Sequence, residues 1–202
     1  MFGLRIPQNF DSPYRASGIA DFWRRWHISL SSWLRDYLYI PLGGNRGGSL
    51  RTTVNLLVTM LLGGLWHGAN WTYVVWGAYH GLLLCLDRSG RSIFERLPGN
   101  ALKRAVTSAL VVVGWVIFRA NNLTGAVYWL RKMFLLEGGG EGAPAVLWMW
   151  LIACLVAVNA TRDTWHYRFA PRPRMSWALA LLLFVAYLFI NGHETVFLYY
   201  QF

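Results

Sequence analysis

The sequence predicts an all-α, polytopic integral membrane protein with about five membrane helices preceded by amphipathic or re-entrant helices. Of its 202 residues, 55% are hydrophobic, 16% aromatic and only 14% charged, which is too apolar for an ordinary soluble domain. A net charge of +10 would suit a nucleic-acid binder, but the basic residues fall in the gaps between apolar runs rather than on one solvated face. We therefore expect membrane lipid around the chain and no nucleic-acid partner.

The first 53 residues are rich in Arg and Trp. From Ile19 to Ile40, apolar residues alternate with Arg, as in an amphipathic helix pair that lies at the interface or re-enters the bilayer. A belt of aromatic and Arg anchors without a catalytic role fits the same pattern, because Trp and Arg are the usual interfacial anchors. The Gly-rich run from Pro41 to Gly48 should end this region, since it cannot continue a helix cheaply.

Five apolar stretches follow, at residues 54–66, 71–86, 105–118, 145–158 and 177–190. Each is shorter than the ~20 residues of an upright spanning helix, so we expect the helices to include flanking residues or to end partway across. If all five cross, 16 of the 19 basic residues fall on one side, which places the N-terminus in the cytoplasm and the C-terminus in the periplasm or outside the cell. We expect residues 54–202 to form this transmembrane region and, with residues 1–53, a single domain.

Two connecting segments carry weaker signals. Residues 123–136 mix aromatic and basic side chains, as an interfacial helix does. Residues 138–144 are Gly-rich but lack phosphate-binding spacing, which predicts a simple connector. Cys85 and Cys154 offer neither a disulfide framework nor a Cys-x-x-Cys metal site, so we interpret them as small hydrophobic side chains.

Two histidines lie in motifs that suggest chemistry. His27 ends the run Asp21-Phe-Trp-Arg-Arg-Trp-His, and His67 lies 40 residues later in Gly64-Leu-Trp-His-Gly. A histidine in an apolar segment is costly to keep there. At membrane depth, desolvation would lower the pKa of His67 and keep its imidazole neutral, able to accept a proton. A core histidine bonded to a neighbouring helix fits the spacing of His67 equally well, and the neighbours Arg24 and Arg25 also allow a plain surface role for His27.

The remaining histidine signals are weaker. His80 lies between Gly77 and Gly81, which suits helix packing as well as chemistry. No His-x-x-x-His or His-Glu-x-x-His occurs and carboxylates are scarce nearby, so we expect no metal site. A Gly-x-Ser-x-Gly nucleophile is also lacking. Direct general-base catalysis by histidine is therefore the simplest chemistry for this chain.

Seven motifs resemble, in order along the chain, the membrane-bound O-acyltransferase family and within it the bacterial alginate O-acetyltransferase branch. They are Asn9-Phe-Asp-Ser-Pro-Tyr, Asp21-Phe-Trp-Arg-Arg-Trp-His-Ile-Ser-Leu-Ser, Trp33-Leu-Arg-Asp-Tyr-Leu-Tyr-Ile-Pro-Leu-Gly-Gly-Asn, Gly64-Leu-Trp-His-Gly-Ala-Asn-Trp, Trp76-Gly-Ala-Tyr-His-Gly, Trp115-Val-Ile-Phe-Arg-Ala and Phe197-Leu-Tyr-Tyr-Gln-Phe. The resemblance runs from about Asn9 to Phe202.

The resemblance implies an integral enzyme of the bacterial inner membrane. Such an enzyme moves an acyl group, usually acetyl, from a thioester to a hydroxyl of an extracytoplasmic polymer such as an exopolysaccharide or cell-wall polymer. The donor would be acetyl-CoA or a carrier-linked thioester acting as co-substrate, with no bound cofactor, and partner acetyltransferase subunits are expected. The family's catalytic histidine falls at His67 and a second important polar position at His27.

We add expectations for substrate contacts. His27, Trp66 and Asn70 would orient acceptor or donor, and the Arg-rich segment would meet donor phosphates on the cytoplasmic side because guanidinium groups bind phosphate well. The complete set of expected substrate-binding residues is Trp66, Asn70, Trp26, Arg24, Arg25, Asp36 and His80.

The length departs from the family pattern, since members usually run to more than twice 202 residues and the first motif normally follows a long N-terminal half. The sequence therefore resembles the C-terminal half, which would be a domain incomplete at its N-terminus. Two alternatives stay open. One is a non-catalytic remnant or a scaffold for an acyl-transfer complex, and the other is a D-alanyl or longer-acyl transferase of the same family.

Overall fold

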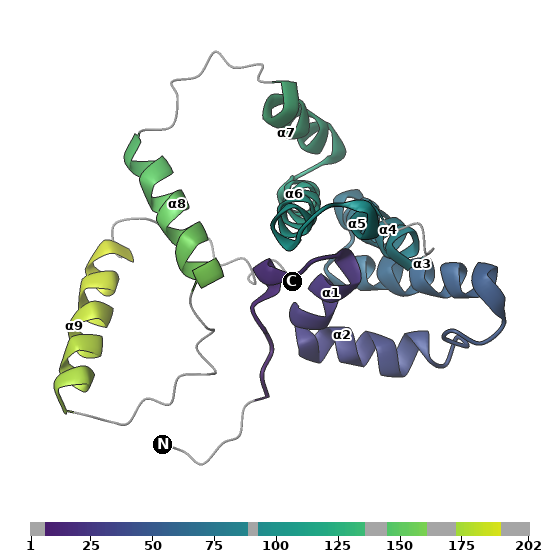
Figure 1. Cartoon of the computed structure of the whole chain (residues 1–202), viewed down its shortest axis with the longest axis horizontal. Helices are drawn as coiled ribbons and strands as arrows, with labels where there is room; N and C mark the ends of the chain where they lie inside the picture. Colours follow the sequence, from purple (N-terminus) through teal and green to yellow (C-terminus); the bar gives the residue numbers. More distant parts are fainter. Residues whose placement is uncertain (1–6, 89–92, 136–144, 161–172, 191–202) are drawn as a thin grey trace. The chain divides into compact units, whose positions relative to one another are not determined.

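The chain folds into consecutive helices, which the computed structural model describes for residues 7–88, 93–135, 145–160 and 173–190 (Figure 1). No strand occurs within those ranges, so the all-α prediction is confirmed there. The chain divides into two units, residues 1–163 and residues 164–202. The candidate site lies in the first unit, and the second contains α9 (Pro173–Ile190).

The N-terminal segment forms the expected pair of short helices. Its elements are the 3₁₀ turn η1 (Pro13–Arg15), α1 (Ile19–Arg25), α2 (Ile28–Leu34) and η2 (Arg35–Tyr39), a stretch of π-helix that continues α2. The chain turns between α1 and α2 at Trp26 and His27. Turns occupy residues 40–47 as predicted, which ends this region before the first long helix.

Each predicted apolar stretch lies inside a helix that includes flanking residues, as expected. After α1 and α2, the described helices of the first unit are α3 (Gly48–Trp66), α4 (Trp71–Arg88), the short α5 (Ile93–Arg96), α6 (Asn100–Arg119), α7 (Leu123–Leu135) and α8 (Ala145–Ala160). Within the described ranges, α6 is the helix that is both long and apolar enough to cross a membrane by itself. The connector predicted at residues 138–144 lies outside the described residues.

Helices α3 and α4 form a tightly packed antiparallel pair (Figure 1). Three glycines allow their backbones to approach closely. A Cβ atom on Gly64 would meet the carbonyl oxygen of Tyr73, and one on Gly81 would lie 3.4 Å from the Cα atom of Leu57. Gly77 and Gly81 are one turn apart on α4, the spacing by which small residues bring membrane helices into contact.

Three polar residues of α3 face the protein interior. Thr52, Asn55 and Thr59 are all buried and recur at a spacing that places them on one helix face. Each has a partner, since Thr59 Oγ1 donates to the carbonyl of Asn55 at 2.7 Å and Asn55 Nδ2 donates to the carbonyl of Gly44 at 3.0 Å. These bonds offset the cost of burying polar groups.

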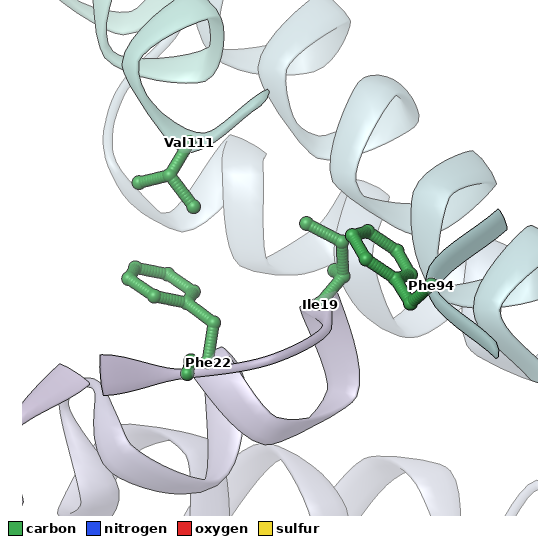
Figure 2. Close-up of a cluster of buried hydrophobic side chains, with 5 residues drawn as sticks. Ile19, Phe22, Phe94 and Val111 are labelled. Carbon is green, nitrogen blue, oxygen red and sulfur yellow. The ribbon is translucent and has the colours of Figure 1, made fainter. Parts of the chain in front are cut away.

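A small apolar core holds α1 against α5 and α6 (Figure 2). Ile19 and Phe22 of α1 are 0% and 3% exposed, and they pack with Phe94 of α5 and Val111 of α6. Burial of side chains of this size contributes about 1.5–3 kcal/mol each. This core therefore fixes the position of the helix that leads into His27.

A carboxylate of α4 also holds the start of α1. The backbone N–H of Ala20 donates to Asp87 at 2.8 Å, and that of Ser17 donates to Asp21 at 3.1 Å. Carboxylates at a helix N-terminus satisfy unpaired N–H groups and interact favourably with the helix dipole. Asp87 therefore connects the end of α4 to the beginning of α1.

The close contact of α3 with α4 requires a residue without a side chain at position 77. We expect Gly77→Ala to lower the free energy of unfolding by about 1–3 kcal/mol through overpacking, because the added Cβ would meet the Met60 carbonyl and lie 3.1 Å from the Cα atom of Leu61. Thermal unfolding of the purified chain in detergent measures this loss. Val75→Ile is the matched control, since it adds a methylene to α4 where the side chain is 37% exposed. Equal midpoints for the two variants would contradict the packing argument.

Candidate functional site

His67 lies in the short turn between α3 and α4, outside both helices. Its backbone N–H donates to the carbonyl of Gly64 at 3.0 Å, which closes the end of α3. Asn70 holds the other end of the turn, because its Oδ1 accepts from the N–H of Thr72 at 3.1 Å and its Nδ2 donates to the carbonyl of Asn121 at 3.0 Å. The turn is thus capped onto α4 and tied to the connection between α6 and α7, which limits the positions open to His67.

Aromatic rings surround the imidazole of His67. The ring centroids of Trp66, Trp76 and Phe118 lie 5.0, 5.5 and 5.0 Å from the imidazole centroid. The ring planes of Trp76 and Phe118 are nearly perpendicular to the imidazole plane. Tyr73 approaches to 6.1 Å. Trp66 itself is 58% exposed, so the imidazole has rings of α4 and α6 on one side and an exposed indole on another. This arrangement restricts the water that can reach it.

His27 adopts a backbone conformation that is uncommon for residues other than glycine. Its φ and ψ of 45° and 54° lie in the left-handed region, which histidine enters more often than most residues but still at a cost. The preceding strand-like segment holds it there: the N–H of Ile28 donates to the carbonyl of Asn9, and the N–H of Asp11 donates to the carbonyl of Arg25, both at 2.9 Å. An uncommon conformation that neighbouring bonds maintain is a frequent sign of a functional position.

The two histidines, 40 residues apart in sequence, lie within electrostatic range of each other. The imidazole of His67 is half-buried, and this burial lowers its pKa, with the positive charge of His27 lowering that pKa further. This is the direction that the sequence predicts. A lowered pKa keeps His67 neutral at physiological pH, the form in which an imidazole can accept a proton.

His80 lies deeper in the same group of rings. It is 1% exposed and contacts Trp23 at 5.2 Å and Trp76 at 5.1 Å between ring centroids. Gly114 of α6 makes room for its Nε2 atom, since a Cβ there would collide with it. Within the described part of the chain, its Nδ1 atom and the indole N–H groups of Trp23 and Trp76 have no hydrogen-bond partner. The three rings contact one another edge-on, at 5.1–5.8 Å between centroids.

Some of the other expected substrate-binding residues contact the rings of the site, and others form ion pairs with neighbours in the sequence. Arg25 pairs with Asp21 at 2.9 Å, and Asp36 pairs with its neighbour Arg35 at 2.7 Å. The hydrogen bond from Arg35 lowers the pKa of the exposed Asp36 carboxyl. Trp26 stacks on a neighbouring ring of α1 and approaches Trp115 of α6 at 5.7 Å. Arg25 and Asp36 therefore have partners within their own segment, whereas Trp66 contacts His67 directly.

Two adjoining cavities lie beside α1. The first, of about 470 Å³, has a charged lining that consists of Asp21, Asp87, Glu95, Arg24, Arg88 and Lys103 together with less polar groups. The second, of about 440 Å³, is mainly apolar and reaches Trp23, Leu34 and Met60. Both are lined by Ala20, Arg24, Leu56 and Leu84. Their volumes fall in the range of small-molecule sites, and Trp23 joins the apolar cavity to the rings around His80.

Sequence reasoning missed three rings that define the site. Trp76, Tyr73 and Phe118 contact His67 but were not expected to do so. Asn70 was the available signal for Tyr73 and Trp76. An Asn cap there predicts a helix that begins at Trp71, and the first turns of such a helix place both rings near His67. Nothing in the sequence pattern links Phe118 to His67, because α6 is brought there by tertiary packing.

Removal of the charge on His27 should change the titration of His67. We expect His27→Gln to raise the pKa of His67, because the positive charge that disfavours the imidazolium form is lost. A pH titration followed by the imidazole C–H resonance, assigned with a His67→Gln variant, measures this shift. Arg96→Gln, which removes a positive charge from an exposed position of α5, is the matched control and should leave the titration unchanged. An unaltered pKa of His67 in His27→Gln would show that the two imidazoles do not interact.

Comparison with known proteins agrees with this geometry. Residues 1–130 match the family model described as MBOAT, membrane-bound O-acyltransferase family. The probable alginate O-acetylase AlgI of Pseudomonas aeruginosa is 57% identical over 135 residues, which cover 66% of this chain and 26% of the relative. The peptidoglycan O-acetyltransferase of Helicobacter pylori is 45% identical over 141 residues, covering 68% of this chain and 27% of the relative.

A further relative has a lower identity. The teichoic acid D-alanyltransferase of Streptococcus thermophilus is 36% identical over 141 residues, covering 58% of this chain and 34% of the relative. The chain thus spans about a quarter to a third of the length of these curated relatives. The residues matched by the family model include both His27 and His67. The chain belongs to the membrane-bound O-acyltransferase family.

Proposed function

We propose that the protein is an O-acyltransferase that moves an acetyl group, or a related acyl group, from a thioester to a hydroxyl of an extracytoplasmic polysaccharide such as alginate or a cell-wall polymer. The observation that carries this proposal is His67, half-buried among aromatic rings with a lowered pKa and a second histidine nearby. The names of the relatives support the class of reaction and acceptor.

In the proposed reaction, neutral His67 takes the proton of the acceptor hydroxyl while that oxygen attacks the thioester carbonyl. The tetrahedral intermediate then collapses, the carbon–sulfur bond breaks, and the imidazolium of His67 returns the proton to the thiolate. Trp76 and Phe118 keep water away from the thioester, which favours transfer over hydrolysis. General-base assistance of this kind contributes about 10²–10⁴-fold to the rate.

The roles proposed for neighbouring residues follow their contacts. His27 would orient the reacting groups from within electrostatic range of His67. Trp66, exposed beside the imidazole, would contact the acceptor. The amide of Asn70 is already bonded at both ends, so its role is to hold the turn. His80 would support Trp76 from beneath.

The adjoining cavities beside α1 support a site for the donor. A thioester carried on phosphopantetheine has a phosphate at one end and a largely apolar arm, which matches a charged cavity that opens into an apolar one. Two carboxylates of the charged cavity accept hydrogen bonds from the N-terminus of α1. Arg24 and Lys103, which line the same cavity, would then meet the phosphate.

We also propose a membrane placement for this chemistry. The protein would lie in the bacterial inner membrane, with α3, α4, α6, α8 and α9 crossing it and the N-terminus in the cytoplasm. The apolar length of α6 and the one-sided distribution of basic residues support this arrangement. Partner acetyltransferase subunits would receive or deliver the acyl group.

The general-base role predicts the effect of removing one imidazole. We expect His67→Ala to lower transfer of labelled acetyl by about 10²–10⁴-fold, measured on polymer recovered from membranes that contain the protein, while its amount in the membrane stays the same. Leu102→Ala, at an exposed position of α6, is the control, and labelled D-alanine in place of acetyl tests the alternative acyl group. Transfer that persists in His67→Ala would favour the non-catalytic alternative.

The donor site predicts a change confined to phosphorylated donors. We expect Lys103→Gln to raise KM for acetyl-CoA several-fold, because one phosphate contact is lost, and to leave KM for a short acetyl thioester without phosphate unchanged. Initial rates with both donors measure the difference. Arg96→Gln is the matched control, since Arg96 is exposed and does not line the cavity. An equal effect on both donors would contradict the assignment of a phosphate to this cavity.

A further inference from the structure

Asn9 makes three hydrogen bonds to the residues that follow His27. Its backbone carbonyl accepts from the N–H of Ile28 at 2.9 Å. Its side-chain Oδ1 accepts from the backbone N–H of Ser29 at 3.0 Å and from the Ser29 hydroxyl at 2.9 Å. The Ser29 Oγ atom in turn lies 3.5 Å from Nδ1 of His27. The polar atoms therefore form a chain from Asn9 through Ser29 to the imidazole.

The directions of these bonds follow from what each group can do. A backbone N–H only donates, so the amide atom of Asn9 that meets the Ser29 N–H must be its oxygen. An amide oxygen only accepts, so the single hydroxyl hydrogen of Ser29 is directed at Oδ1 of Asn9. The Ser29 oxygen then has only lone pairs to offer to His27, and the contact requires that Nδ1 carry the hydrogen.

We propose that Asn9 and Ser29 hold neutral His27 as its Nδ1–H tautomer, so that Nε2 is the nitrogen that accepts protons and hydrogen bonds. This inference rests on the proposed function, in which His27 orients the reacting groups. Asn9 and Ser29 are positioning residues that act through His27. A free imidazole in water prefers the opposite tautomer, with hydrogen on Nε2, so the chain of bonds reverses the ordinary preference.

The consequence concerns which atom of His27 serves the reaction. Nδ1 lies against Ser29 in the first turn of α2. With hydrogen on Nδ1, Nε2 keeps its lone pair and can accept a hydrogen bond from an acceptor hydroxyl or from the imidazolium of His67. The left-handed backbone of His27, which the bonds of Asn9 maintain, sets the ring in this position. The 3.5 Å separation is long for a hydrogen bond, so we expect a biased tautomer equilibrium rather than a complete lock.

Nitrogen NMR on histidine measures the tautomer without any assay of activity. The chain is labelled with ¹⁵N at its five histidines, purified in nanodiscs and compared with His27→Asn to assign His27, at a pH where His27 is neutral. We expect hydrogen mainly on Nδ1 in the wild type and mainly on Nε2 in Ser29→Ala. Ser29→Thr, which keeps the hydroxyl, should retain the wild-type tautomer. Ser31→Ala is the matched control, since its hydroxyl donates to the carbonyl of Trp26 at 3.0 Å and does not contact His27.

Variants of Asn9 separate the chain of bonds from a direct effect of Ser29. In Asn9→Leu the Ser29 hydroxyl is released and can donate to Nδ1, so we expect hydrogen on Nε2 even though Ser29 is intact. Asn9→Asp keeps an accepting oxygen and should preserve the wild-type tautomer. Both substitutions leave the backbone bond to Ile28 in place, and circular dichroism confirms that each variant is folded. Hydrogen on Nε2 in the wild type, or an unchanged tautomer in both Ser29→Ala and Asn9→Leu, would overturn the proposal.

The activity assay distinguishes this proposal from the proposed function. We expect Ser29→Ala to lower kcat about 10-fold with little change in KM, as when a functional histidine loses the bond that orients it, and Ser29→Thr to restore it. The expected tautomer without any acetyl transfer would refute the enzyme and leave the chain of bonds intact. Transfer that depends on His67, combined with hydrogen on Nε2 of wild-type His27, would refute only the role of Asn9 and Ser29.

Discussion

The close contact between α3 and α4 is the constraint on which the site depends. Gly64, Gly77 and Gly81 allow the backbones of the two helices to come into contact. The chain reverses direction between the helices within a few residues. Where lipid surrounds helices, such packing replaces the hydrophobic effect as the force that joins them. A wider separation would lengthen the turn and release His67 from Trp76, the ring that follows it on α4. The position of the imidazole is thus a property of two helix backbones.

A second constraint brings His27 toward that turn. Ile19 and Phe22 bury α1 against α5 and α6, and Asp87 accepts a hydrogen bond at the start of the same helix. Because α1 is short and well anchored, the residue that follows it has little freedom. His27 occupies the break between α1 and α2 in an uncommon backbone conformation. The unfavourable free energy of this left-handed backbone conformation is offset by burial of the core and by the hydrogen bonds to Asn9.

The site combines features that favour function over stability. An imidazole surrounded by rings is poorly solvated as a cation, which keeps it neutral and ready to accept a proton. His80, Trp23 and Trp76 bury polar nitrogen atoms that lack ordinary hydrogen bonds within the described residues, an arrangement that a purely structural core would avoid. One of these rings, Trp23, also lines the apolar cavity beside α1. Polar groups with few partners are therefore concentrated where the chemistry is proposed.

The sequence by itself determined the helical class, the approximate position of every long helix and the two histidines proposed for the site. Apolar runs, Gly and Pro breaks and local motifs carry that information because helix formation and termination depend on residues close in the chain. Residues 19–40 were recognisable as a broken helix pair for the same reason. Asn70 was recognisable as a polar residue of the site, but its function as the cap of α4 was not.

Only the tertiary structure decided which groups meet. Phe118 against His67, Gly114 against His80 and Asn9 beside His27 join segments that no sequence period connects. Arg25 and Asp36, which were expected to contact substrate, form local ion pairs. Opposite charges a few residues apart in the chain are already within reach of each other. Long-range contacts of this kind depend on how helix faces pack, and a single sequence records the faces without recording their partners.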